Sequence, residues 1–126
     1  MKQKPSFLII DDHLVIRRGL TFLLKDRFPA STIESTDQSN VVLSKIKNQP
    51  YDLLIQDLAL PKFEPLSFIN MVLTFQPKQS ILVYSMSPEE LFTRRVLNLG
   101  AKGYLEKSAS ESTLFKAIDT ILKGGR

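Results

Sequence analysis

Cysteine and tryptophan are absent from this chain of 126 residues, and histidine occurs once, as His13. Without cysteine the chain cannot form a disulfide scaffold, a thiolate metal site or a cysteine nucleophile. A single histidine also excludes metal sites built from several imidazoles. The absence of cysteine agrees with a reducing compartment.

Long apolar stretches are missing as well. The longer uninterrupted runs, such as residues 7–10 and 58–60, are far shorter than the ~20 residues that span a bilayer. The apolar run that follows the first five residues is also too short for a signal peptide. We therefore expect a cytoplasmic protein without a membrane partner.

The charge is moderately basic, with 17 lysines and arginines against 13 acidic residues and a net charge of +4. The basic residues are dispersed, and no stretch interleaves them with aromatic side chains as a base-stacking surface would. This pattern indicates solvated helix faces rather than direct nucleic-acid binding. The length, with 43% hydrophobic and 24% charged residues, is typical of one globular domain.

Short apolar runs alternate with longer amphipathic stretches, which predicts repeated βα units around a parallel sheet. Strands are expected at residues 7–10, 32–35, 52–57, 81–84 and 103–105, and helices at 13–28, 38–48, 66–75, 88–99 and 110–123. The mostly apolar run 52–57 suits a central strand that is covered on both faces. We expect an α/β fold, a flavodoxin-like (βα)5 doubly wound sandwich of strand order 2-1-3-4-5, with residues 1–126 as a single domain.

Polar residues follow the strands at the edge of the sheet where such folds bind ligands. They are Asp11, Asp12, Asp57, Ser85, Glu106 and Lys107. The three aspartates should converge, and each like-charged pair costs about 4 kcal/mol at roughly 4 Å and an effective dielectric constant of about 20. A Mg²⁺ ion would compensate this repulsion. Lys107 would add a cation at the far side, and Ser85 a hydroxyl donor.

Four segments in this order resemble the receiver domain of bacterial two-component response regulators. They are Asp11-Asp12-His13, Asp57-Leu58-Ala59-Leu60-Pro61, Ser85-Met86 and Gly103-Tyr104-Leu105-Glu106-Lys107. The pattern Gly-Tyr-Leu-x-Lys-x-Ala-Ser and the closing Gly124-Gly125 are especially similar to the NarL/FixJ (LuxR-type) subfamily. The resemblance covers essentially the whole chain.

The resemblance implies a role for each residue at these strand ends. Asp57 would accept a phosphoryl group from a sensor histidine kinase. Mg²⁺ would be held by Asp12 directly, by Asp11 more through water, by Asp57 and by the backbone carbonyl of Ala59. Lys107 and Ser85 would bind the phosphoryl group, and Ser85 with Tyr104 would form the conformational switch. His13 is assigned no catalytic role.

The resemblance also implies partners and a mode of action. The chain would act as a signalling switch whose only chemistry is self-phosphorylation and self-dephosphorylation, and a second copy of the chain is a candidate partner. Transcription would be controlled through an attached or separate output domain, and DNA would be bound only through a C-terminal helix-turn-helix domain absent from this chain. Both an excised receiver and a single-domain regulator remain open.

Three positions depart from the family's usual pattern. Pro65 stands where the family usually has glycine, Gln56 is polar in the central strand, and Met86 is bulky beside Ser85.

Three other functions are alternatives to the phosphorylated switch. The main one is a docking or dimerisation module that is never phosphorylated, but the complete acid pocket argues against it. A flavin-binding flavodoxin would need a phosphate-binding loop after the first strand. An aspartate-nucleophile phosphatase would need a second aspartate at the position of Ala59.

Overall fold

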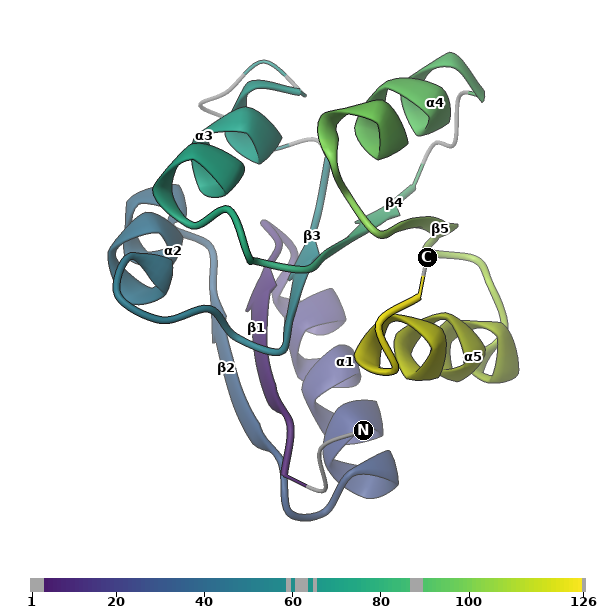
Figure 1. Cartoon of the computed structure of the whole chain (residues 1–126). Coiled ribbons are helices and arrows are strands. Elements are labelled where there is room, and N and C mark those ends of the chain that lie inside the picture. The colour runs from purple at the N-terminus through teal and green to yellow at the C-terminus, as the bar shows by residue number, and fades with distance from the viewer. Residues whose placement is uncertain (1–3, 59, 61–63, 65, 87–89, 126) are drawn as a thin grey trace.

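The computed structural model describes residues 4–58, 60, 64, 66–86 and 90–125. Strands and helices alternate along the chain (Figure 1) as β1 (Ser6–Ile10), α1 (Leu14–Arg27), β2 (Thr32–Thr36), α2 (Ser39–Ile46), β3 (Leu53–Gln56), α3 (Ser67–Phe75), β4 (Ile81–Ser85), α4 (Glu90–Leu99), β5 (Gly103–Glu106) and α5 (Glu111–Leu122). All five strands are parallel, in the order β2-β1-β3-β4-β5. The predicted fold class and strand order are confirmed.

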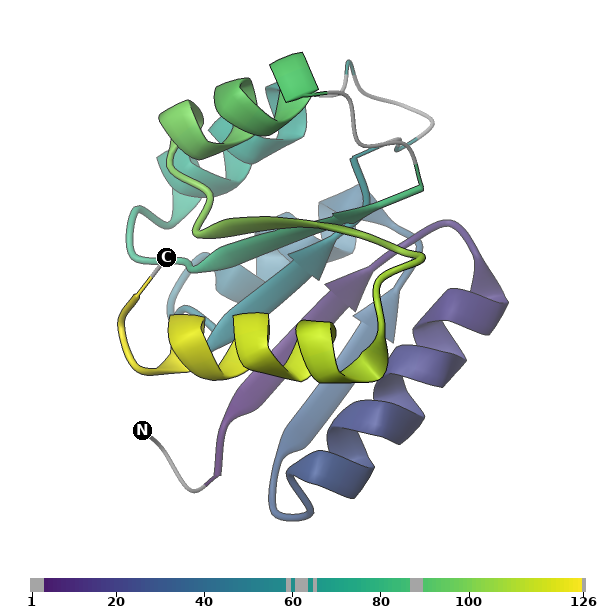
Figure 2. The ribbon, with the colours of Figure 1, turned by 90° about the vertical axis from the view of Figure 1, so that its right-hand side faces the viewer.

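The sheet is covered on both faces, by α1 and α5 on one side and by α2, α3 and α4 on the other (Figures 1 and 2). The sequence produces two cores because neighbouring strand residues point to opposite faces. On β1, Phe7 and Ile9 pack with α1 and α5, whereas Leu8 and Ile10 pack with α2 and α3. This double burial explains why the strands are apolar runs rather than alternating ones.

The central strand β3 is buried at all four positions. Its last residue, Gln56, is fully buried, and neither polar atom of its amide has a hydrogen-bond partner among the described residues. Gln56 pairs in register with Ile10 of β1 and Val83 of β4. The polar residue noted in the sequence therefore lies inside the sheet, directly before Asp57.

The start of α5 and the end of α4 each follow from one residue type. Ser110 caps α5, because its hydroxyl accepts a hydrogen bond from the backbone N–H of Thr113 at 3.1 Å. Gly100 ends α4 with a φ of 120°, which side chains other than glycine rarely adopt. Ser87 directly precedes the helix expected at residues 88–99 and suits its N-cap, but it lies outside the described residues. The loop residue Pro65 and the site residue Ala59 lie outside them as well. Within the described part of the chain, the helices are too short or too polar to cross a bilayer.

Candidate functional site

Two buried carboxylates meet where β1 and β3 end. Asp11 follows β1 and Asp57 follows β3, and their exposed fractions are 2% and 3%. The backbone N–H of Asp57 donates to the carbonyl of Ile10 at 3.0 Å, which extends the pairing of the two strands. The position of both side chains is thus set by the register of the two central strands.

Lys107 supplies the cation that compensates these carboxylates. Its Nζ lies 2.7 Å from Asp11 Oδ2 and 3.2 Å from Asp57 Oδ2, and its side chain is 2% exposed. The sequence placed this lysine at the far side of the pocket, but it lies against both acids. Two buried like charges need a counterion in contact, and Lys107 provides one.

The backbone of Lys107 is itself anchored on β4. Its N–H donates to the carbonyl of Ser85 at 2.8 Å, and the hydroxyl of Tyr84 donates to its carbonyl at 3.3 Å. Burial raises the pKa of Tyr84, although the charge of Lys107 acts in the opposite direction, so the phenol stays protonated as a donor. Sequence reasoning missed Tyr84, whose only signal is its place directly before Ser85.

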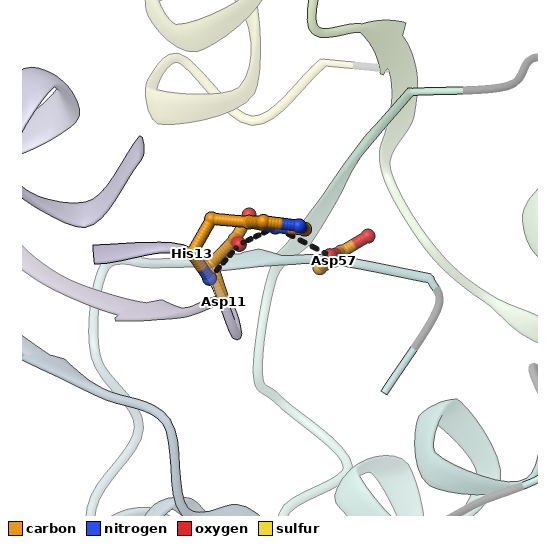
Figure 3. Close-up of side chains that lie close together, drawn as sticks. All are labelled: Asp11, His13 and Asp57. Atoms are coloured by element: carbon orange, nitrogen blue, oxygen red, sulfur yellow. Dashed lines mark hydrogen bonds and ion pairs between the residues drawn. The ribbon is translucent and has the colours of Figure 1, made fainter. Parts of the chain in front are cut away.

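His13 joins the cluster from the turn after β1 (Figure 3). Its Nδ1 lies 2.9 Å from Asp11 Oδ1 and 4.0 Å from Asp57 Oδ2. The backbone N–H of His13 also donates to Asp11 Oδ1 at 2.8 Å, an aspartate turn of a common type. His13 was given no role from the sequence, and its position two residues after Asp11 was the signal that could have drawn attention to it.

Asp12 is exposed and does not belong to this cluster. Of the three aspartates expected to converge, the structure brings Asp11 and Asp57 together. The chain bends at Asp12, after β1 has ended, so the side chain of Asp12 is exposed where that of Asp11 is buried. Of the other predicted metal ligands, Ala59 lies outside the described residues.

Ser85 and Tyr104 flank the pocket on the β4–β5 side. Ser85 is 5% exposed at the end of β4. Tyr104 on β5 is half-buried and packs against the core beneath α2, α3 and α4. It borders one groove of about 310 Å³ beside α5 and a second of about 490 Å³ beside α4.

The chemistry of the pocket fits a metal ion. Two carboxylates and one ammonium leave a net charge of about −1 when His13 is neutral. One donor atom from each of Asp11, His13 and Asp57 lies within 4.8 Å of the others, so the cluster is consistent with a metal site. Carboxylate oxygens are ligands that Mg²⁺ accepts together with water and phosphate oxygens.

The chain is similar in sequence to known proteins. The family model described as "Response regulator receiver domain" matches residues 7–119. The Fimbriae Z protein of Escherichia coli (strain K12) is 28% identical over 122 residues, which cover 96% of this chain and 58% of that protein. The transcriptional regulatory protein YdfI of Bacillus subtilis (strain 168) is 30% identical over 117 residues, which cover 93% of this chain and 54% of that protein.

A solved structure agrees with these sequence matches. The crystal structure of a LuxR family DNA-binding response regulator from Silicibacter pomeroyi aligns with a TM-score of 0.81 and 28% identity, covering 96% of this chain and 93% of that one. The chain spans little more than half the length of the curated relatives it matches. The resemblance found in the sequence is confirmed.

Proposed function

The chain belongs to the response regulator receiver domain family, and on this premise we propose that it is a phosphorylation-controlled switch that accepts a phosphoryl group on Asp57 from a sensor histidine kinase. A receiver domain is a signalling module rather than a classical enzyme. The observation that carries the proposal is Asp57 itself, a buried carboxylate at the end of the central strand with the Nζ of Lys107 at 3.2 Å.

The proposed chemistry requires one nucleophile and several charges. A carboxylate oxygen of Asp57 attacks phosphorus while the bond from phosphorus to the donor's imidazole nitrogen breaks, and that nitrogen keeps the electron pair. Lys107 pairs with the incoming phosphoryl oxygens as a point charge, and the hydroxyl of Ser85 donates to one of them. In self-dephosphorylation water attacks phosphorus, the bond from phosphorus to the carboxylate oxygen of Asp57 breaks, and inorganic phosphate leaves with the carboxylate restored.

Mg²⁺ would neutralise charge on the transferred phosphoryl group when it is bound. Asp11 and Asp57 are supported as its ligands by their burial and by the charge of the pocket. Asp12 and the carbonyl of Ala59 are assigned from the family resemblance alone. Removing Asp12 is expected to weaken Mg²⁺ binding more than removing Asp11.

The partners are inferred from exposed apolar side chains on α1 and from the relatives. Leu14, Val15 and Phe22 are 50%, 81% and 71% exposed, and Val15 and Phe22, seven residues apart, lie on one face of the helix. Exposed large apolar side chains on one face favour a protein partner. This surface would meet the kinase or a second copy of the chain in the cytoplasm. Control of transcription would pass through an output domain, because YdfI is a transcriptional regulatory protein and the Silicibacter pomeroyi protein is a DNA-binding response regulator.

Intact-mass measurement after incubation with acetyl phosphate and Mg²⁺ tests the proposal. The chain should gain one phosphoryl group, and hydroxylamine should remove it. Asp57→Asn should gain no phosphoryl group. Lys107→Ala should keep its Mg²⁺ affinity but be impaired in phosphorylation, because the ammonium of Lys107 attracts the phosphoryl group and not the metal ion. Unchanged labelling of Asp57→Asn would refute the assignment. An unlabelled wild-type chain that still self-associates would favour the docking-module alternative.

A further inference from the structure

We propose that His13 is a nitrogen ligand of the metal pocket and that it gives the pocket a preference for transition-metal ions, such as Zn²⁺ and Co²⁺, over Mg²⁺. The inference rests on the proposed function only in placing a metal ion between Asp11 and Asp57. It adds a ligand of a different chemical class, which the sequence interpretation had left without a role.

The two oxygens of Asp11 are divided between two neighbours. Oδ2 lies 2.7 Å from the Nζ of Lys107, whereas Oδ1 lies 2.9 Å from Nδ1 of His13. Lys107 therefore approaches Asp11 through one oxygen, and the imidazole approaches it through the other. A cation on the His13 side can bind Asp11 Oδ1 while Lys107 keeps Oδ2. At Asp57 the ion would share Oδ2 with Lys107, whose Nζ lies 3.2 Å away.

The donor atoms are spaced for one ion. Ligands about 2.1 Å from a metal lie roughly 3.0–3.4 Å apart when adjacent and about 4.2 Å apart when opposite. His13 Nδ1 is 2.9 Å from Asp11 Oδ1 and 4.0 Å from Asp57 Oδ2 (Figure 3). These separations fall close to that range, so small side-chain movements bring the three donors onto one ion.

Hydrogen bonds fix the backbone from which the imidazole projects. The N–H of His13 donates to Asp11 Oδ1 at 2.8 Å, and Nη1 of Arg17 donates to the carbonyl of Asp11 at 2.6 Å. The side chain of His13 is 59% exposed, so ions and water reach it without opening of the fold. A metal ion can bind Nδ1 only when that nitrogen carries no proton, so the ring proton of the bound form lies on Nε2.

Ligand chemistry determines the preference. Imidazole nitrogen suits Zn²⁺ and other first-row transition metals, whereas Mg²⁺ takes oxygen ligands and retains water. A pocket made of carboxylates alone would gain less affinity when Zn²⁺ replaces Mg²⁺. Because His13 is the sole histidine and cysteine is absent, an imidazole signal in a metal titration reports on this one residue.

The test uses the untagged, ¹⁵N-labelled full chain and long-range ¹H–¹⁵N correlation spectra of the imidazole. One equivalent of Zn²⁺ should shift the Nδ1 resonance to a value typical of a metal-bound nitrogen and leave the proton on Nε2. Mg²⁺ should shift the amide signals of Asp11 and Asp57 and move Nδ1 only by the smaller change that the loss of its contact with Asp11 produces. In parallel, His13→Asn should weaken Zn²⁺ and Co²⁺ binding at least about tenfold, the range seen when groups that only support a metal ligand are lost. The Mg²⁺ affinity of this variant should change little.

Two results would overturn the inference. In one, Zn²⁺ shifts the Asp11 and Asp57 signals and leaves Nδ1 unchanged, which places the ion on oxygen ligands alone. In the other, Asp11→Asn/Asp57→Asn keeps wild-type Zn²⁺ affinity, which places His13 in a separate surface site. Phosphorylation of His13→Asn by acetyl phosphate with Mg²⁺ is scored separately, so failure of the proposed switch is distinguished from failure of this ligand assignment.

Discussion

Two buried glutamines illustrate how differently one residue type is accommodated in this protein. Gln79 is 2% exposed, and its amide exchanges two hydrogen bonds with the backbone of Tyr51, at 2.9 and 3.0 Å. Gln56 is fully buried, and its amide has no hydrogen-bond partner in the described part of the chain. A buried amide without a partner loses its hydration without replacement, so Gln56 should lower the stability of the fold.

Gln56→Met should therefore raise the free energy of unfolding by about 1–2 kcal/mol, because it removes an unpaired polar group at similar volume. Gln79→Met is the matched control and should lower it by about 1–3 kcal/mol, because it leaves the backbone of Tyr51 unpaired. Urea unfolding of both variants measures the difference. Equal destabilisation would mean that the amide of Gln56 makes a stabilising contact.

The edge strand β2 shows how an element can depend on polar contacts. β2 is only partly buried and pairs with β1 alone. Its Glu34 accepts a hydrogen bond from the hydroxyl of Tyr51. Glu34 also forms an ion pair with Lys45 of α2, with 3.1 Å between Oε1 and Nζ. The hydrogen bond from Tyr51 lowers the pKa of Glu34, and burial together with that bond raises the pKa of Tyr51.

These shifts predict a pH dependence of stability. The raised pKa of Tyr51 stabilises the fold below about pH 10, the ordinary value for tyrosine, and this contribution is lost as the pH rises further. Tyr51→Phe should cost about 1 kcal/mol at neutral pH and show a smaller decline in alkali. Urea midpoints between about pH 8 and pH 11 measure both effects. Parallel curves for the two proteins would contradict the role of this phenol.

The elements themselves were predictable because local signals marked them. Proline and glycine ended the apolar periods, and the observed bounds lie within two residues of the expected ones wherever both ends are described. The strand ends predicted Asp11 and Asp57 as neighbours, since parallel strands end at the same edge, but the contact of Lys107 with both acids was not predicted. The direction of Asp12 and the approach of His13 could not be predicted, because they depend on side-chain geometry within one turn rather than on periodicity.

For the molecule as a whole, the arrangement of β4 and β5 connects the pocket to a distant surface. The backbone N–H of Lys107 donates to the carbonyl of Ser85 at the end of β4. Two residues before Ser85 on the same strand, Val83 pairs with Tyr104 of β5. In the proposed switch a phosphoryl group adds nearly two negative charges, which Ser85 and Lys107 would meet. Tyr104 packs on the α4 side of the sheet and borders a groove of about 490 Å³ there, and in the proposed switch this groove would receive its ring.

Activation should therefore change β4, α4 and Tyr104 together and leave the sheet intact. Beryllofluoride with Mg²⁺ should shift amide resonances mainly within residues 85–108 and should change self-association through α4–α5 or α1–α5. The shift in population is expected to be partial, because reversing a 1:99 ratio needs about 5.5 kcal/mol of differential binding. Shifts confined to the pocket, without a change in association, would identify a phosphoacceptor without this switch.

The central claim is that the phosphoryl group is attached to Asp57, and peptide mapping tests it most directly. Borohydride reduces an aspartyl phosphate to homoserine, and tandem mass spectrometry then locates the altered residue after acetyl phosphate treatment with Mg²⁺. The account predicts homoserine at position 57 alone, and none when Mg²⁺ is withheld. Reduction at Asp11 or Asp12, or a stable phosphate on Ser85, would contradict it.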